Sequence, residues 1–377
     1  MLDVAIVGGG PVGATLAALA ASSGLSIALF EARSGPSGDK RILALSHASR
    51  ERLEEVRAWP AASATPIASI HISQRGGPGR TLLEAAEQAL PALGYTVPYA
   101  ALESELSTAL RECGVPVRYG AACTGIRLAS DAATLDLASG EEVHARLLVI
   151  ADGGSSAARI PGVAFTEKDY GQLAIVGALR TDRPHGARAY ERFTPQGPMA
   201  LLPVEDRYAL VWTAAPERAR ELLALEQSAF LAALQDAFGD RAGRFVSIEE
   251  RNAFALKLRT VNSPVALRTV IVGNAAQALH PVAGQGLNLG LRDAAAVADL
   301  VRSMPEAAGS GEMLQAYREA RRRDASRGVA FTDFLVSIFS DGRRIPTWGR
   351  GLALAVLDAL PPARRLLAER MIYGAPS

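Results

Sequence analysis

The sequence contains little cysteine, few aromatic residues and almost no net charge. Its 377 residues include 2 cysteines, 5 histidines and 6% aromatic residues, and the formal net charge is +1. Cys113 and Cys123 fit no CxxC or metal-ligand spacing, so we expect free thiols in a reducing compartment and no metal site. The balanced charge argues against nucleic-acid binding, because such binding requires a basic face.

Long apolar runs are also missing. No stretch reaches the roughly 18 consecutive apolar residues that a membrane-spanning helix needs. A strand is predicted from residue 4 onward, which leaves no room for a secretory signal, so we expect a cytoplasmic protein. With 49% hydrophobic residues, the chain is long enough to bury one large core or two adjoining cores.

The first glycine-rich loop follows a short apolar run near the N-terminus. Val4–Val7 is rich in β-branched residues, as in a strand buried on both faces of a parallel sheet. A helix predicted over about Pro11–Ser23 would direct its free N–H groups at a pyrophosphate. Together the strand, loop and helix predict a dinucleotide site that includes Gly8, Gly10, Pro11, Val12 and Gly13.

An acidic residue ends the next predicted strand. The strand Ser26–Phe30 leads into Glu31, followed by Ala32 and Arg33, and a carboxylate at this place accepts hydrogen bonds from an adenosine ribose. The alternative is an ordinary glycine-rich turn with an incidental acid. Because strand, loop, helix, strand and acid occur in register, the dinucleotide interpretation is favoured, but it does not separate FAD from NAD.

Two later loops make that separation. The apolar run Leu147–Ile150 leads into Asp152 and Gly153, followed by Ser155, Ser156 and Arg159, and the run Thr269–Val272 leads into Gly273 and Asn274. Either pair alone is an ordinary turn. Combined with the first loop, they indicate one extended ligand, a flavin adenine dinucleotide.

The third loop continues into a predicted helix. Pro281 and the segment Gly284, Gln285 and Gly286 precede Leu287–Asp293, which has a helical pattern and contains Asn288. N–H groups at the start of this helix would face the flavin edge that becomes negative on reduction. We expect Gly286 to lie where a Cβ would collide with the flavin or leave a glycine-only backbone conformation.

Several longer segments resemble a known family. These are residues 41–46, 70–76, 189–194, 197–203 and 273–281. Together with the three loops they resemble the group A flavoprotein aromatic hydroxylases, the class of p-hydroxybenzoate hydroxylase. Within that class the chain is most similar to the ubiquinone-biosynthesis hydroxylases of the 2-polyprenyl-6-methoxyphenol hydroxylase type, over essentially its whole length.

The resemblance implies an α/β fold. It consists of a Rossmann-like FAD-binding domain of the glutathione-reductase-like type, an inserted antiparallel-sheet substrate domain and C-terminal helices. We place the discontinuous FAD-binding domain at 1–72, 96–168 and 259–311, the substrate domain at 73–95 and 169–258, and the helical region at 312–377. One helix is predicted over about 217–238.

The resemblance also implies the activity. Reduced flavin would react with dioxygen, and the C4a-hydroperoxide would transfer an oxygen atom to the ring of a small lipophilic phenol. NAD(P)H would be a transient co-substrate, docking near Asp152 and Arg159. Two alternatives remain open: an FAD-dependent reductase or epoxidase of an isoprenoid, and a non-catalytic scaffold of a quinone-synthesis complex. A peripheral contact with the inner membrane face would fit a prenylated substrate.

By position in the family, Arg41 would be a flavin-contacting cation. His280 is a candidate acid or base, with a structural role as the alternative. Asn274 stands where most of the class has Asp, which keeps an acceptor but loses the charge. The substrate pocket is predicted to include Phe193, Leu201, Pro203 and Trp212.

Overall fold

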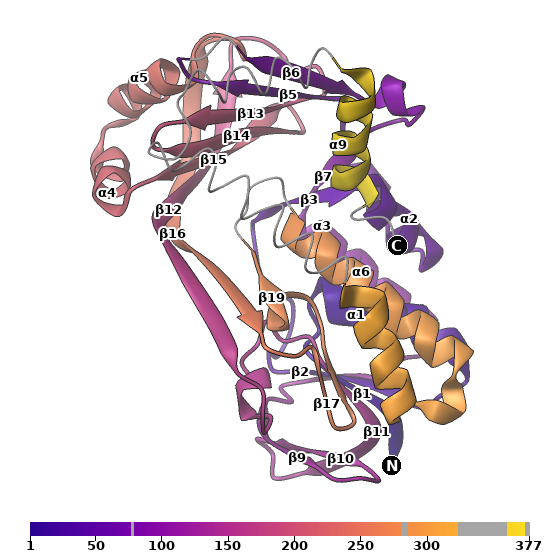
Figure 1. The fold of residues 1–377 in the computed structure, drawn as a ribbon. Helices are drawn as coiled ribbons and strands as arrows, with labels where there is room; N and C mark the ends of the chain where they lie inside the picture. Colours follow the sequence, from indigo (N-terminus) through magenta and orange to yellow (C-terminus); the bar gives the residue numbers. More distant parts are fainter. Residues whose placement is uncertain (77–78, 280–284, 323–359, 374–377) are drawn as a thin grey trace.

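The computed structural model describes residues 1–76, 79–279, 285–322 and 360–373 (Figure 1). Two large sheets and one small sheet organise these residues, and helices cover the sheet faces. No helix in the described ranges is long and apolar enough to cross a membrane.

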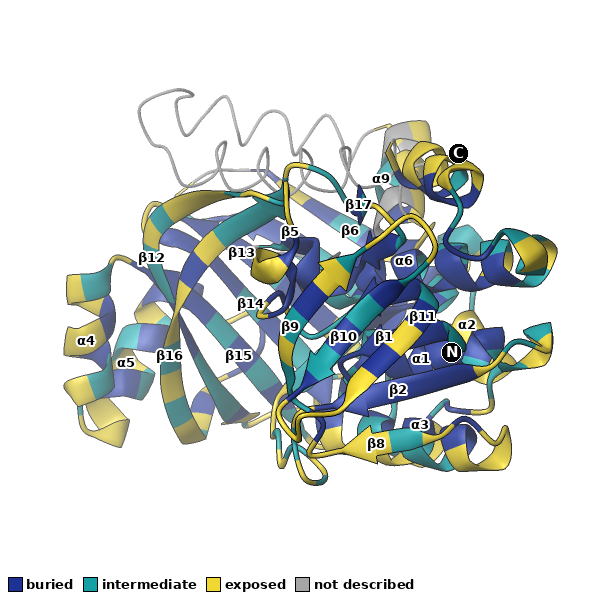
Figure 2. Ribbon diagram, turned by 90° about the horizontal axis from the view of Figure 1, so that it is seen from below, coloured by how far each residue is buried: buried dark blue, intermediate teal, exposed yellow. Residues whose placement is uncertain are grey.

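The first large sheet carries the three glycine loops. Its strands follow the order β17-β18-β11-β1-β2-β8, with the hairpin β9–β10 joined to β11. The bounds are β1 Leu2–Val7, β2 Ile27–Glu31, β8 Val117–Tyr119, β9 Cys123–Leu128, β10 Ala133–Leu137, β11 Glu142–Ile150, β17 Val265–Ala266 and β18 Thr269–Ile271. β18, β11, β1, β2 and β8 run parallel. Both faces of β1 and β2 are buried, which explains their continuous apolar runs (Figure 2).

Helices pack on one face of this sheet. They are α1 Pro11–Ala20, α3 Tyr99–Glu112 and α6 Gln285–Ser303, and residues 311–322 are also helical. Side chains from these helices and from alternate positions of β1, β2 and β11 form one buried core. α1 and α6 approach closely because Gly290 faces Val12, where a Cβ would lie 2.8 Å from a valine methyl.

The second large sheet is mostly antiparallel and has the order β19-β16-β12-β15-β14-β13-β5-β6. The bounds are β5 Ser69–Gln74, β6 Arg80–Glu84, β12 Phe165–Thr181, β13 Arg188–Thr194, β14 Gly197–Val204, β15 Arg207–Ala214, β16 Phe245–Val261 and β19 Gln277–Ala278. The long strands β12 and β16 connect this sheet to the region of the first one (Figure 1). The outer face packs against α4 Pro216–Ala224 and α5 Gln227–Phe238.

A small sheet lies between helix α6 and strand β14 and contacts both of them. The small sheet has the order β3-β7-β4, with β3 Ile42–Ser46, β4 Thr65–Ile67 and β7 Gly94–Pro98. α2 His47–Glu55 and α9 Pro361–Tyr373 lie beside it. Short 3-10 turns are at Ala21–Ser23, Ala61–Ser63, Ala85–Gln88, Ala157–Arg159, Gly273–Ala275 and Pro305–Ala307.

The predicted fold class is confirmed, with two differences in detail. The helix predicted over 217–238 is two helices, because Leu225 and Glu226 have extended backbone angles between α4 and α5. The predicted boundary at residue 72 falls inside β5, which pairs with β13 along Ser69–Gln74 and therefore belongs to the second sheet.

Candidate functional site

The strand register brings the glycine loops to one edge of the first sheet. Val7 on β1 lies beside Phe30 on β2 and Ile150 on β11, and Ile150 lies beside Ile271 on β18. Each of these residues is at or next to the carboxyl end of its strand. The loops that follow therefore start from the same edge, where open α/β sheets bind their ligands.

The first loop needs glycine for two different reasons. Gly8 has a φ of +106°, and a Cβ there would lie 2.6 Å from the carbonyl carbon of Ala151. A Cβ at Gly13 would collide with the Gly8 carbonyl oxygen. Gly10 has free space instead, with Tyr99 Oη at 3.8 Å as the nearest atom to its Cβ position. The space at Gly10 is open for a ligand to approach the backbone.

Helix α1 begins at this opening. Its N-cap is Gly10, and no side chain caps the helix start. The unpaired N–H groups and the positive end of the helix dipole are therefore available to a bound anion such as a pyrophosphate.

Glu31 lies at the end of β2 with its carboxylate held in place. Oε2 accepts a hydrogen bond from the Gly9 N–H at 2.7 Å, and Oε1 accepts from the Arg33 N–H at 2.9 Å and from Arg33 Nε at 3.0 Å. Burial opposes ionisation, but these hydrogen bonds outweigh it and lower the pKa of Glu31. Arg33 also pairs with Glu103 at 2.8 Å. A charged acceptor is thus fixed at the end of β2, where the sequence predicts a contact with a ribose.

Asp152 uses its carboxylate to shape its own loop. It accepts hydrogen bonds from the Gly154 N–H at 2.9 Å, the Ser155 hydroxyl at 2.6 Å and the Ser156 N–H at 2.9 Å. The guanidinium of Arg259, from β16, bridges the carbonyls of Gly153 and Asn274. The second and third loops are therefore joined by a cation that the sequence did not identify.

A buried ion pair supports the third loop. Asp293 on α6 accepts hydrogen bonds from the Gly273 N–H at 3.0 Å and Gln277 Nε2 at 3.1 Å, and pairs with Arg321 at 2.7 Å. Burial raises the pKa of Asp293, while Arg321 opposes that rise. This pair holds the Gly273 turn against α6, and it too was missed from the sequence.

Asn288 joins α6 to β3. Its Oδ1 accepts hydrogen bonds from the Ser46 N–H at 2.8 Å and the Ser49 hydroxyl at 2.7 Å, and its Nδ2 donates to the Ala44 carbonyl at 3.0 Å. The side chain predicted to bind cofactor is buried and bonded to protein groups. The Asn288 side chain nevertheless lines the smaller of the two cavities described below.

The glycine loops open on a cavity of about 1320 Å³. This volume exceeds the roughly 300–1,000 Å³ of pockets for drug-sized ligands, so it has room for a dinucleotide. The predicted residues along it are Gly8, Gly10, Pro11, Val12, Glu31, Ala32, Arg33, Arg41, Asp152, Gly153, Ser155, Ser156, Asn274, Gly286 and Leu287. Gly13 and Gly273 lie behind this lining, where they permit close packing.

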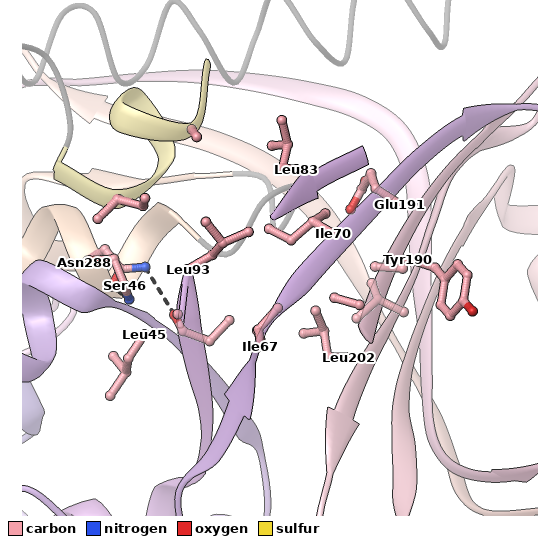
Figure 3. Close-up of a pocket in the computed structure, with 17 residues that line it drawn as sticks. Leu45, Ser46, Ile67, Ile70, Leu83, Leu93, Tyr190, Glu191, Leu202 and Asn288 are labelled. Carbon is pink, nitrogen blue, oxygen red and sulfur yellow. Dashed lines mark hydrogen bonds between the residues drawn. The ribbon is translucent and has the colours of Figure 1, made fainter. Parts of the chain in front are cut away.

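A smaller cavity of about 90 Å³ lies on the inner face of the second sheet (Figure 3). Its lining is mainly aliphatic, and the polar side chains there include those of Ser46, Glu191 and Asn288. Ala44, Leu202 and Val211 line both cavities, which therefore adjoin.

Two of the four predicted substrate-pocket residues lie on the face of the second sheet that packs against α4 and α5. Leu201 and Trp212 pack in the core on the opposite face of the sheet, where the Trp212 ring contacts Phe230 at 5.7 Å between centroids. Their chain neighbours Leu202 and Val211 line the smaller cavity instead.

The remaining two pocket candidates are not among the residues that line the two cavities, although Phe193 packs in one cluster with Leu83, which lines the smaller cavity. Pro203 is buried and its carbonyl accepts a hydrogen bond from Thr96. Phe193 packs in a buried cluster with Ile72 and Leu83.

Arg41 and Gly286 both line the large cavity, but Gly286 lacks the predicted glycine-only backbone. Arg41 is exposed, pairs with Asp39 and lies over the Tyr99 ring at 5.5 Å from its centroid. Gly286 lies within α6 without a positive φ, and the nearest atom to its Cβ position, Asn274 Oδ1, is 4.0 Å away. The expectation of a glycine-only backbone there is wrong. His280, Pro281, Gly284 and the side chain of Gln285 lie outside the described residues.

Comparisons with known proteins agree with this geometry. A family model described as an FAD-binding domain matches residues 1–332. The chain belongs to this family of FAD-binding proteins. A ubiquinone hydroxylase, UbiL, of Rhodospirillum rubrum is 34% identical over 377 residues, covering 97% of this chain and 88% of that one. The 3-demethoxyubiquinol 3-hydroxylase of Escherichia coli is 33% identical over 339 residues, covering 85% and 86%.

Within the family this chain is an FAD-dependent monooxygenase, as the resemblance implied. A solved structure, p-nitrophenol 4-monooxygenase PnpA from Pseudomonas putida, matches with a TM-score of 0.79 at 17% identity, over 100% of this chain and 99% of that one. At that identity the likeness concerns the fold. The open start of α1, the fixed Glu31 carboxylate and the cavity volume all fit FAD.

Proposed function

We propose that this monooxygenase hydroxylates the ring of a prenylated phenol, similar to 2-polyprenyl-6-methoxyphenol, in ubiquinone biosynthesis. The observation that carries the proposal is the contact between the two cavities, which share Ala44, Leu202 and Val211. A ring in the smaller cavity would lie next to a ligand in the larger one. The names of the ubiquinone-pathway relatives support this class of substrate.

The lining of the smaller cavity suits an electron-rich aromatic ring. Ile67, Ile70, Leu83 and Leu93 converge on it from β4, β5, β6 and the segment before β7 (Figure 3). Such a surface excludes water, and a dry site protects reactive species from side reactions. The specificity for an apolar phenol would follow from this lining.

When bound, FAD would supply the activation of dioxygen and the transfer of one oxygen atom. The chain would hold the pyrophosphate with the N–H groups at the start of α1, and the ribose with Glu31. The backbone at Asn274 and Gly286 would support the flavin end of the same cavity. NAD(P)H would bind transiently as the electron donor, near Asp152 and Arg159.

Exposed residues of helix α9 support a peripheral membrane contact, through which the substrate would enter. Its exposed residues include Leu366 at 49%, which follows the exposed Arg365, and Tyr373 at 47% at the end of the helix, and Leu360 just before the helix is 50% exposed. Apolar side chains beside arginines favour the surface of an anionic bilayer. Ala368 and Ile372 of the same helix line the smaller cavity, so a peripheral contact would lie close to the substrate.

The test is turnover of a short-chain 2-prenyl-6-methoxyphenol by the FAD-loaded protein with NADH or NADPH. We expect one hydroxyl group to be added to the ring, identified by mass and product NMR. Consumption of nucleotide with an unchanged ring, or saturation of an isoprenoid double bond, would contradict the proposal and favour a reductase. Restoration of quinone in a deletion strain by a variant that cannot bind FAD would point to a scaffold.

A further inference from the structure

Glu191 is the acidic residue in the wall of the smaller cavity (Figure 3). It lies on β13, an interior strand of the second sheet, between Ala200 of β14 and Ile72 of β5. The side chains around it are aliphatic, and they include Ile70, Leu83 and Leu202. The carboxyl group therefore lies in a mainly aliphatic wall, whose other polar side chains include those of Ser46 and Asn288.

No described residue compensates this carboxyl. Within the described ranges, no hydrogen bond donor or cation reaches Glu191, and burial raises its pKa to about 8. The adjacent Arg192 is bonded elsewhere, to the Ala237 carbonyl and the Ser73 hydroxyl, each at 3.3 Å. Leaving a carboxyl without a partner in an apolar wall costs stability, so its presence calls for a ligand that completes it.

We propose that Glu191 is a catalytic residue that accepts the phenolic proton of the substrate, which rests on the proposed function above. The phenolic O–H bond breaks, an O–H bond forms on the carboxylate, and the electron pair remains on the phenolic oxygen. That pair delocalises onto the ring carbons ortho and para to the oxygen, which become more nucleophilic toward the oxygen atom supplied by the flavin. A base with its pKa near the operating pH is suited to this transfer.

The other ionisable groups near the smaller cavity have partners of their own or are exposed. Tyr190 also borders the cavity, but its hydroxyl donates to the Arg241 carbonyl at 3.1 Å. His71 on β5 packs against Tyr190, with 5.7 Å between ring centroids. On α9, Arg364 pairs with Glu87 of the turn after β6 at 2.8 Å, and Glu369 is exposed. A pH effect near 8 that disappears on changing Glu191 would therefore come from this carboxyl.

The test compares Glu191→Gln with Glu84→Gln in the FAD-loaded protein, using the short-chain 2-prenyl-6-methoxyphenol. Glu84 is an exposed residue of β6 in the same sheet and serves as the matched control. In the wild type and the control, kcat should rise with pH through an apparent pKa near 8, because the carboxylate is the active form. The glutamine variant should lose this rise and about 100-fold in kcat, with unchanged FAD content and flavin reduction.

A glutamine variant with kcat within twofold of the wild type and the same pH dependence would overturn the proposal while leaving the proposed function intact. If the wild type and Glu84→Gln add no hydroxyl to the phenol, the proposed function fails, and this role of Glu191 fails with it. If Glu191→Gln does not retain FAD, Glu191→Asp is used to test the catalytic role instead. Its shorter side chain should keep the pH-dependent rise with kcat about 10-fold lower, and wild-type kcat in that variant would also refute the role.

Discussion

Replacing Gly8 by alanine should destabilise the protein through two separable effects. Gly8 has a φ of +106°, which costs an L-residue roughly 1–2 kcal/mol. The new Cβ would also lie 2.6 Å from the carbonyl carbon of Ala151 and the amide nitrogen of Asp152. Both atoms belong to one backbone peptide and cannot move by a rotamer change, so overpacking adds about 1–3 kcal/mol. We expect a total loss of roughly 2–5 kcal/mol.

Two control variants separate the cost of the backbone angle from the cost of the close contact. Gly24→Ala has a φ of +76° with no atom within 4 Å of the Cβ position, so it carries only the backbone cost. Gly35→Ala has neither a positive φ nor a close atom and should remain within about 0.5 kcal/mol of the wild type. Urea unfolding of the FAD-free proteins, with m-values compared, gives the three free energies. Equal stability of Gly8→Ala and Gly24→Ala would show that the Ala151–Asp152 peptide moves aside, and would refute the assigned role of the contact.

Three other changes test the electrostatics. Arg321→Met leaves Asp293 charged and buried, so urea unfolding should show a loss of about 3–5 kcal/mol, and a loss below about 1 kcal/mol would contradict the pair's supporting role. Glu31→Gln should lower the free energy of unfolding by roughly 1–3 kcal/mol at neutral pH. Because the folded-state pKa of Glu31 is lowered, the stability difference between wild type and variant should shrink as the pH falls below 4.5 and the folded-state carboxylate becomes protonated. Burial raises the folded-state pKa of Glu191 to about 8, so the wild type should lose stability relative to Glu191→Gln as the pH rises from 4.5 to about 8. The slope should reach roughly 1.4 kcal/mol per pH unit. A stability difference that does not change with pH would exclude the raised pKa.

The cofactor loops could be predicted from the sequence because their constraints are local. Gly8 has a positive φ, Gly13 faces the Gly8 carbonyl oxygen within one strand-loop-helix unit, and Glu31 follows the next strand directly. The contact of Gly8 with Ala151 of the second loop is not local and could not be predicted. Five elements in a row specify such a unit without knowledge of the rest of the fold. The first 33 residues were therefore enough to predict where the pyrophosphate and the adenosine ribose would bind.

The substrate wall could not be predicted in the same way. On β14, Leu201 and Leu202 are both apolar, because one face of the sheet packs on α4 and α5 and the other borders the cavity. Alternation identifies the two faces but does not say which one holds the ligand. Glu191 is the single acid of β13, whose sequence RAYERFT also contains Arg188 and Arg192, so nothing in this strand predicted a carboxyl in the cavity wall.

The supporting ion pairs depend on tertiary contacts. Asp293 and Arg321 meet across two helices, and Arg259 reaches two loops from a long strand of the second sheet. Periodicity places each residue on its own element but gives no partner. Such pairs become visible only when the elements are packed together.

The position of β18 in the first sheet determines when the cofactor site can form during synthesis. β18 (Thr269–Ile271) pairs with β11 (Glu142–Ile150), which pairs with β1 at the N-terminus. A ribosome releases β1, β2 and β11 long before β18, and strands β12 to β16 of the second sheet are made in between. Contacts so distant in sequence form slowly. FAD should therefore bind only after most of the chain has emerged from the ribosome. A chain that has bound FAD would then already have its first sheet complete.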